Sequence, residues 1–159
     1  MSVTTEPAQD LLEQTSKSQH PHCIVCGRAA ECGLGLRFRS LSDGSVEAQF
    51  ACPARYQGYE GMLHGGVTSS LLDGAMTNCL FAHGLVAVTA DMTVRFRHPI
   101  AIREPLLVQA SITRSQSPLH IVEAKIVQAG QVKAKAQGKF MEKANGEYVA
   151  DTRKVQAEP

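Results

Sequence analysis

The sequence contains no tryptophan, and it has only three tyrosines and five phenylalanines. An aromatic stacking pocket is therefore not strongly indicated. Sixteen basic residues face fifteen acidic ones, so neither sign of charge is in excess. Proteins that bind nucleic acid or a membrane surface usually carry a marked basic excess. The charge balance therefore argues against both kinds of partner.

Long hydrophobic runs are also absent. The most apolar stretch, residues 67–82, is too short for a membrane span and contains Asp73 and Asn78. The opening MSVTTEPAQD lacks the basic segment followed by an apolar one that marks a signal peptide. We therefore expect a cytoplasmic protein, and its 159 residues fit one domain with a real core.

The five cysteines are an odd number in a chain of this size, which argues against a secreted disulfide scaffold. Three of them fall in HPHCIVCGRAAEC, residues 20–32, where a Cys-x-x-Cys lies beside histidine. This spacing is similar to that of zinc sites, with Cys23, Cys26, Cys32 and His22 as the candidate ligands. No second Cys-x-x-Cys or histidine pair follows, so a reduced, metal-free turn is the alternative. A zinc ion here would be structural, and no cofactor is expected to be required.

Period-two alternation of apolar and polar residues dominates the middle of the chain. It predicts strands over residues 34–40, 45–51, 88–98, 105–115, 119–129 and 131–141. In the third of these, one face carries Val88, Ala90, Met92, Val94 and Phe96, and the other carries Thr89, Asp91, Thr93, Arg95 and Arg97. The turn Ser42-Asp43-Gly44 joins the first two strands as a hairpin.

One long helix is expected over residues 66–83, with Gly84 as its C-terminal cap. A helix that is apolar nearly all round must be enclosed. The order of two strands, one helix and four strands therefore predicts an α+β fold, in which an antiparallel sheet curls around a central helix. We expect residues 21–143 to form this domain. Residues 1–20 should be a flexible tail or a short surface helix, and residues 144–159 a second flexible tail.

Asp73 is the unusual residue of the helix, because a buried carboxylate is costly unless it is hydrogen-bonded or paired. Its neighbours at helical spacing are Ser69, Ser70 and Thr77. In one reading their hydroxyls hold the carboxylate, or it points to solvent. In the other it faces a cleft and acts as a base or nucleophile.

His64-Gly65-Gly66 stands where this helix begins. The first N–H groups of a helix lack internal partners, and glycine lets a ligand approach them closely. An oxyanion formed from a carbonyl is a fitting occupant, although plain capping and tight turning are the alternative. Asp73 lies two helical turns further on, roughly 10–13 Å along the axis. Since one chain cannot bring the two together, the spacing predicts a site shared across a dimer interface.

The stretch YQGYEGMLHGGVTSSLLDGAM, residues 56–76, resembles the signature loop and helix of hotdog-fold acyl-CoA thioesterases. It is most similar to the phenylacetate-degradation-type branch of the 4-hydroxybenzoyl-CoA thioesterase superfamily. CIVCGRAAECGLGLRFR, residues 23–39, is also similar to a segment that precedes the first strand in some members. The resemblance covers roughly residues 23–142.

The resemblance implies roles for individual residues. Asp73 matches the carboxylate that attacks the thioester or activates water, and Gly65 and Gly66 match the glycines whose amides polarise the carbonyl. His64 matches a histidine that orients the site. Thr77 matches a position that helps place the attacking group in some members, and Gln57 one that supports the carbonyl. Members form active sites at a dimer interface, so we expect a homodimer, which in this family often pairs again into a homotetramer.

Coenzyme A carries phosphates, which basic side chains near the mouth of the site would bind. Arg95, Arg97, His98 and Arg103 are the candidates, and a solvated sheet face is the alternative reading. The expected reaction is hydrolysis of an acyl- or aroyl-CoA to a free acid and CoA. A non-catalytic acyl-CoA or lipid binder and an enoyl-CoA hydratase are the other candidate functions, and the sequence does not indicate the acyl group.

Overall fold

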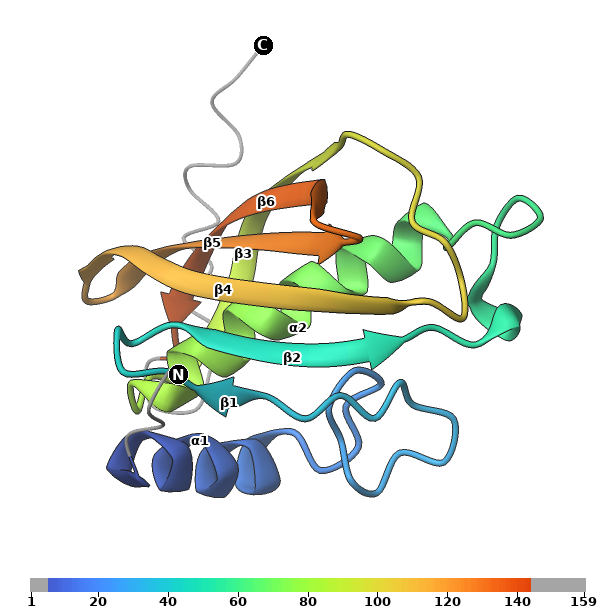
Figure 1. Cartoon of the computed structure of the whole chain (residues 1–159). Helices are drawn as coiled ribbons and strands as arrows, with labels where there is room; N and C mark the ends of the chain where they lie inside the picture. The colour runs from blue at the N-terminus through green and yellow to red at the C-terminus, as the bar shows by residue number, and fades with distance from the viewer. Residues whose placement is uncertain (1–5, 144–159) are drawn as a thin grey trace, which may run out of the picture.

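The computed structural model describes residues 6–143, which form one antiparallel sheet with a helix against it (Figure 1). In chain order the elements are α1 (Glu6–Gln19), β1 (Arg39–Ser40), β2 (Val46–Ala51), η1 (Ala54–Tyr56), α2 (Gly65–Ala82), β3 (Ala87–Phe96), β4 (Pro105–Gln116), β5 (Leu119–Gln128) and β6 (Gln131–Glu142). The strands lie in the order β1-β2-β4-β5-β6-β3. The predicted α+β arrangement is confirmed.

Helix α2 is the centre of the core. Leu71, Leu72, Ala75, Met76, Cys79 and Leu80 are fully buried against the inner faces of the strands. The helix ends in a Schellman motif, as the sequence predicts. The Leu85 N–H donates to the Leu80 carbonyl and the Gly84 N–H to the Phe81 carbonyl. Gly84 has φ +71°, a left-handed conformation that glycine adopts without steric cost.

The first predicted strand is the least accurate strand prediction, because only Arg39 and Ser40 pair in the sheet. Residues 34–38 keep the predicted burial, with Leu36 and Phe38 buried. Their backbone bonds elsewhere: the Leu34 and Leu36 N–H groups donate to the carbonyls of residues 24 and 25 in the cysteine segment. A strand ladder is therefore replaced by pairing with the preceding loop.

Residues 6–19 form helix α1, so they are not a flexible tail; the alternative of a short surface helix describes them. Leu12 is buried in the main core and anchors the helix there. The Gln9 side chain donates to the Phe38 carbonyl and accepts from the Ser40 N–H, so it covers the outer edge of β1. Residues 144–159, expected to be a second tail, lie outside the described part of the chain.

The opposite edge of the sheet is β3. In residues 6–143 its strand partner is β6, and its other side has none. The unpaired N–H and C=O groups of this ten-residue strand can form hydrogen bonds with a strand of another chain. Within the same residues, no helix is both long and apolar enough to cross a membrane.

Candidate active site

Asp73 lies midway along α2, half-buried, on the side that faces β3. Its Oδ1 atom accepts a hydrogen bond of 2.6 Å from the hydroxyl of Thr89 on β3. The hydroxyls of its helical neighbours Ser69 and Ser70 donate instead to the backbone carbonyls of Gly65 and Gly66. The carboxylate is therefore held by another element, and not by the hydroxyls of its own helix.

Thr89 reaches Asp73 because of a β-bulge. The pairing of β3 with β6 skips Ala90: Thr89 lies opposite Phe140, and Asp91 lies opposite Lys139. The extra residue reverses the alternation in the first part of the strand. Thr89 therefore shares the inner face with buried Phe140, where strict alternation placed it on the outer face.

The predicted face assignment is correct after the bulge and wrong before it. Met92 and Val94 lie opposite Gly138 and Ala136 and are half-buried, as expected. Thr89 is the residue that sequence reasoning missed. An interruption of the alternation would have indicated the bulge, but the sequence alternates regularly through residues 88–97.

Of the two glycine amides at the beginning of α2, one is capped and one is free. His64 is the N-cap residue, and its Nδ1 accepts a 2.9 Å hydrogen bond from the Gly66 N–H. Nδ1 therefore carries no proton. Among the described residues, no group accepts from the Gly65 N–H. Of the two glycine amides predicted to bind an oxyanion, only the Gly65 amide is available as a donor.

Phe96 lies at the far end of β3 from Thr89, beside this helix start. A Cβ placed on Gly65 would lie 3.6 Å from the Phe96 ring, and that ring is 57% exposed. The inner face of β3 thus has Asp73 and Thr89 at one end and Gly65 and Phe96 at the other.

The remaining predicted catalytic residues lie further from Asp73 or make other bonds. Thr77 is buried one turn beyond Asp73, and no hydrogen bond joins its hydroxyl to the carboxylate. Gln57 is exposed in the loop before α2, and its Oε1 accepts from the Gly61 N–H at 3.2 Å. That bond stabilises the loop that leads into His64.

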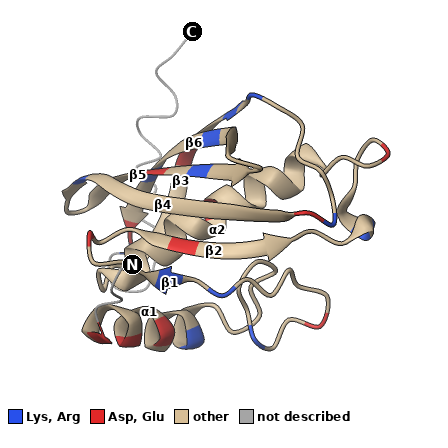
Figure 2. Cartoon of the chain, viewed as in Figure 1, with Lys and Arg blue, Asp and Glu red and all other residues tan. Residues whose placement is uncertain are grey.

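The four predicted phosphate-binding residues are not brought together as one group. Arg95 and Arg97 line a polar groove of about 1010 Å³ on the outer face of the sheet, together with Lys125 and Lys135. His98 and Arg103 are not among the residues that line it. Figure 2 shows basic residues on the strands near β6 and mainly acidic residues along α1.

The cysteine segment brings together a different group of candidate ligands from the one predicted. His20, Cys23 and Cys26 lie together, whereas His22 and Cys32 are exposed and stand outside this group. The turn after α1 directs the His20 ring towards the sulfurs. Cys52 and Cys79 are core residues, and burial raises the pKa of their thiols to about 11 and about 12.

Residues 60–135 match the family model of the thioesterase superfamily. Among curated proteins, the acyl-coenzyme A thioesterase THEM4 of Rattus norvegicus is 27% identical over 64% of this chain. The match covers 43% of the length of that relative.

Two solved structures are similar in fold. The PaaI protein of E. coli, from the phenylacetic acid degradation operon, superposes with a TM-score of 0.74 at 20% identity, over 89% of this chain and 97% of that one. The protein smu.793 of Streptococcus mutans, bound to acetyl-CoA, superposes with a TM-score of 0.64 at 19% identity, over 69% of this chain and 89% of that one. The likeness confirms the hotdog fold.

Proposed function

Because residues 60–135 match the family model of the thioesterase superfamily, we propose that this protein hydrolyses an acyl- or aroyl-CoA thioester to the free acid and CoA. The observation that carries the proposal is that one helix has both a hydrogen-bonded carboxylate, Asp73, and a free amide at its start, on Gly65. Matches to an acyl-CoA thioesterase and to a neighbour bound to acetyl-CoA support the substrate class.

The Gly65 N–H donates to the carbonyl oxygen of the thioester. Its position at the helix N-terminus favours the negative charge that develops on that oxygen. His64 fixes the geometry by holding the neighbouring Gly66 amide, which leaves the Gly65 amide as the free glycine donor of the first turn. Gly66 thus takes a capping role in place of the oxyanion role expected from the resemblance.

Asp73 attacks the thioester carbon or removes a proton from the attacking water. Thr89 donates to Oδ1, which fixes the carboxylate and leaves Oδ2 for the reaction. The tetrahedral intermediate then collapses and expels the CoA thiolate. If Asp73 is the nucleophile, this leaves a mixed anhydride on its carboxylate, which water hydrolyses to the free acid. If Asp73 is the base, the collapse gives the free acid directly, and the proton held by Asp73 passes to the thiolate. Arg95, Arg97, His98 and Arg103 are proposed to bind the CoA phosphates, with the outer groove as the place for the first two.

The site requires two chains. Gly65 and Asp73 are separated by eight residues, or roughly 12 Å along the helix. On β3, Thr89 lies beside Asp73 and Phe96 lies beside Gly65. If two β3 edges pair antiparallel about the point between Met92 and Thr93, Thr89 of each copy lies opposite Phe96 of the other. Asp73 of one protomer then approaches Gly65 of its partner, and the dimer contains two such sites.

A panel of acyl-CoA substrates, from acetyl and long-chain acyl to phenylacetyl and 4-hydroxybenzoyl, tests the reaction by following thiol release. Asp73→Asn should abolish turnover, because the amide can neither attack nor accept a proton. Asp10→Asn, the same change on the exposed face of α1, should have no effect. Full turnover by the Asp73 variant, or no thiol release from any substrate, would overturn the proposal.

A further inference from the structure

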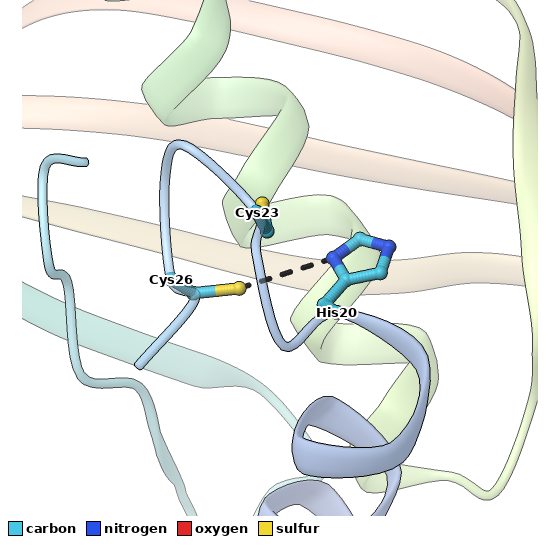
Figure 3. Close-up of side chains that lie close together, drawn as sticks. All are labelled: His20, Cys23 and Cys26. Carbon is cyan, nitrogen blue, oxygen red and sulfur yellow. Dashed lines mark hydrogen bonds between the residues drawn. The ribbon is translucent and has the colours of Figure 1, made fainter. Parts of the chain in front are cut away.

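Two thiols and one imidazole converge at the end of α1, in a part of the molecule that the proposed hydrolysis does not use. His20 Nδ1, Cys23 Sγ and Cys26 Sγ all lie within 4.8 Å of one another (Figure 3). Cys26 Sγ and His20 Nδ1 are 3.9 Å apart. Ligand atoms around a tetrahedral zinc ion lie roughly 3.5–3.8 Å apart, given bond lengths of about 2.3 Å to sulfur and about 2.0 Å to nitrogen.

The turn that contains both cysteines is built for this arrangement. The Val25 N–H donates to Cys23 Sγ at 3.4 Å, and the Gly27 N–H closes the turn on the Cys23 carbonyl at 2.8 Å. A Cβ on Gly27 would lie 2.4 Å from the Cys23 nitrogen, so only glycine fits there. The turn therefore holds both sulfurs on the same side, where a single ion can reach them.

Helix α2 supplies a donor to the second sulfur. The buried Asn78 amide donates to Cys26 Sγ at 3.4 Å and to the Gly74 carbonyl at 2.8 Å. N–H groups directed at sulfur stabilise thiolates, and such groups commonly surround metal-bound cysteines.

An ion can reach this group from solvent. His20 and Cys26 line a cavity of about 870 Å³ between α1 and the first two strands. Three protein ligands leave a fourth coordination position, which water or a small anion from this cavity can fill. Two thiolates with one imidazole is a set that suits zinc among the common divalent metals.

We propose that His20, Cys23 and Cys26 bind one zinc ion, with the fourth position open to the cavity. The ion joins the end of α1 to the cysteine turn, and Asn78 joins that turn to α2. Its role is to hold the amino-terminal helix against the central one.

The first experiment uses the full chain, purified without chelators and passed through gel filtration. Elemental analysis by mass spectrometry should give one zinc per chain. After the zinc is removed and replaced by Co²⁺, the visible spectrum should show intense tetrahedral bands and a thiolate-to-cobalt charge-transfer band. This measurement needs no variant, so it does not depend on whether a substituted chain folds.

The second experiment compares two matched pairs of variants. His20→Gln and Cys23→Ser should each lose the metal or weaken its binding at least tenfold against a chromophoric chelator. His22→Gln and Cys32→Ser change the same residue types in the same segment and should bind zinc like the unchanged protein. Adding zinc to the apo form should raise the melting temperature of the control variants but not that of His20→Gln.

Three results would overturn the proposal. One is an unchanged protein that holds no zinc and gives no cobalt charge-transfer band. Another is equal loss of metal in the His22 or Cys32 variant. The third is a disulfide between Cys23 and Cys26 in the isolated protein that, once reduced, still leaves a chain unable to bind zinc. Thioesterase activity is not the readout, so the zinc site can fail while the proposed hydrolysis stands, and the reverse.

Discussion

The hydrogen bond between Thr89 and Asp73 offers the sharpest test of the candidate active site. Thr89→Val keeps the shape of the side chain and removes its hydroxyl. The bond is 2.6 Å long and its acceptor is a carboxylate. Hydrogen bonds to charged groups contribute about 1.5–3 kcal/mol. If that contribution is made in the transition state, its loss corresponds to a decrease in kcat of roughly 10- to 150-fold.

The pattern of the change is as informative as its size. Thr89 touches the carboxylate and not the thioester, so kcat should decrease while KM stays close to its original value. Thr89→Ser, which keeps a hydroxyl, should retain most of the activity. Thr93→Val makes the same change on the outer face of the same strand, opposite Gln137, and should be neutral. Steady-state kinetics on the best substrate of the panel measure all three.

A result that refutes the reasoning is easily stated. If Thr89→Val keeps kcat within threefold of the original value and melts at the same temperature, the hydroxyl does not position the carboxylate. If Thr93→Val loses as much activity as Thr89→Val, the effect comes from the strand and not from this bond.

Two further predictions concern stability. Gly74→Ala in α2 should destabilise the fold by about 1 kcal/mol, because its new Cβ would lie 2.5 Å from Val25 Cγ1. The cost of such overpacking is about 1–3 kcal/mol, which outweighs the gain in helix propensity of about 1 kcal/mol. In urea unfolding, Val25→Ala should relieve the clash, so the double variant is more stable than the sum of the single ones; a strictly additive result contradicts the packing argument. Hydrogen bonds, first from His120, hold the pKa of Glu142 below its usual 4.5, so stability that is present above about pH 4.5 should be lost as the pH falls through the lower folded-state value. Glu142→Gln should remove this part of the acid dependence, and an unchanged acid profile would contradict it.

Much of the fold could be predicted from the sequence because its signals are local. Alternating residues and turn residues located β2, β4, β5 and β6 to within two residues at each end. The apolar run located α2, and Gly84 located its end. The prediction failed where a long-range contact decides the structure. Residues 34–38 alternate like a strand, but their backbone pairs with the cysteine loop. The pair Leu11-Leu12 did not reveal that Leu12 enters the core.

The sequence shows which residues are candidates for the site, but it does not show their contacts. Asp73 and the glycine motif are visible because a carboxylate in an apolar helix and two glycines at a helix start are both unusual. Thr89 was not visible, because a bulge adds one residue without changing the apparent alternation. The role of Gly66 was also hidden, since only geometry shows which amide His64 occupies. His20 lies beside Cys23 and Cys26 where His22 was expected, because spacing alone does not show which ring turns towards the sulfurs.

The two edges of the sheet differ in a way that limits how many chains can join by strand pairing. At β1, a two-residue strand ends the sheet beside α1 (Figure 1). There the side chain of Gln9 bonds the Ser40 N–H and the carbonyl of the preceding residue Phe38. At β3, the ten-residue strand has no strand partner on its outer side within the described residues. A molecule with one blocked edge and one open edge can add a single neighbour by strand pairing. Two copies joined through β3 would present only blocked edges, so polymerisation stops at its first step and no fibre follows.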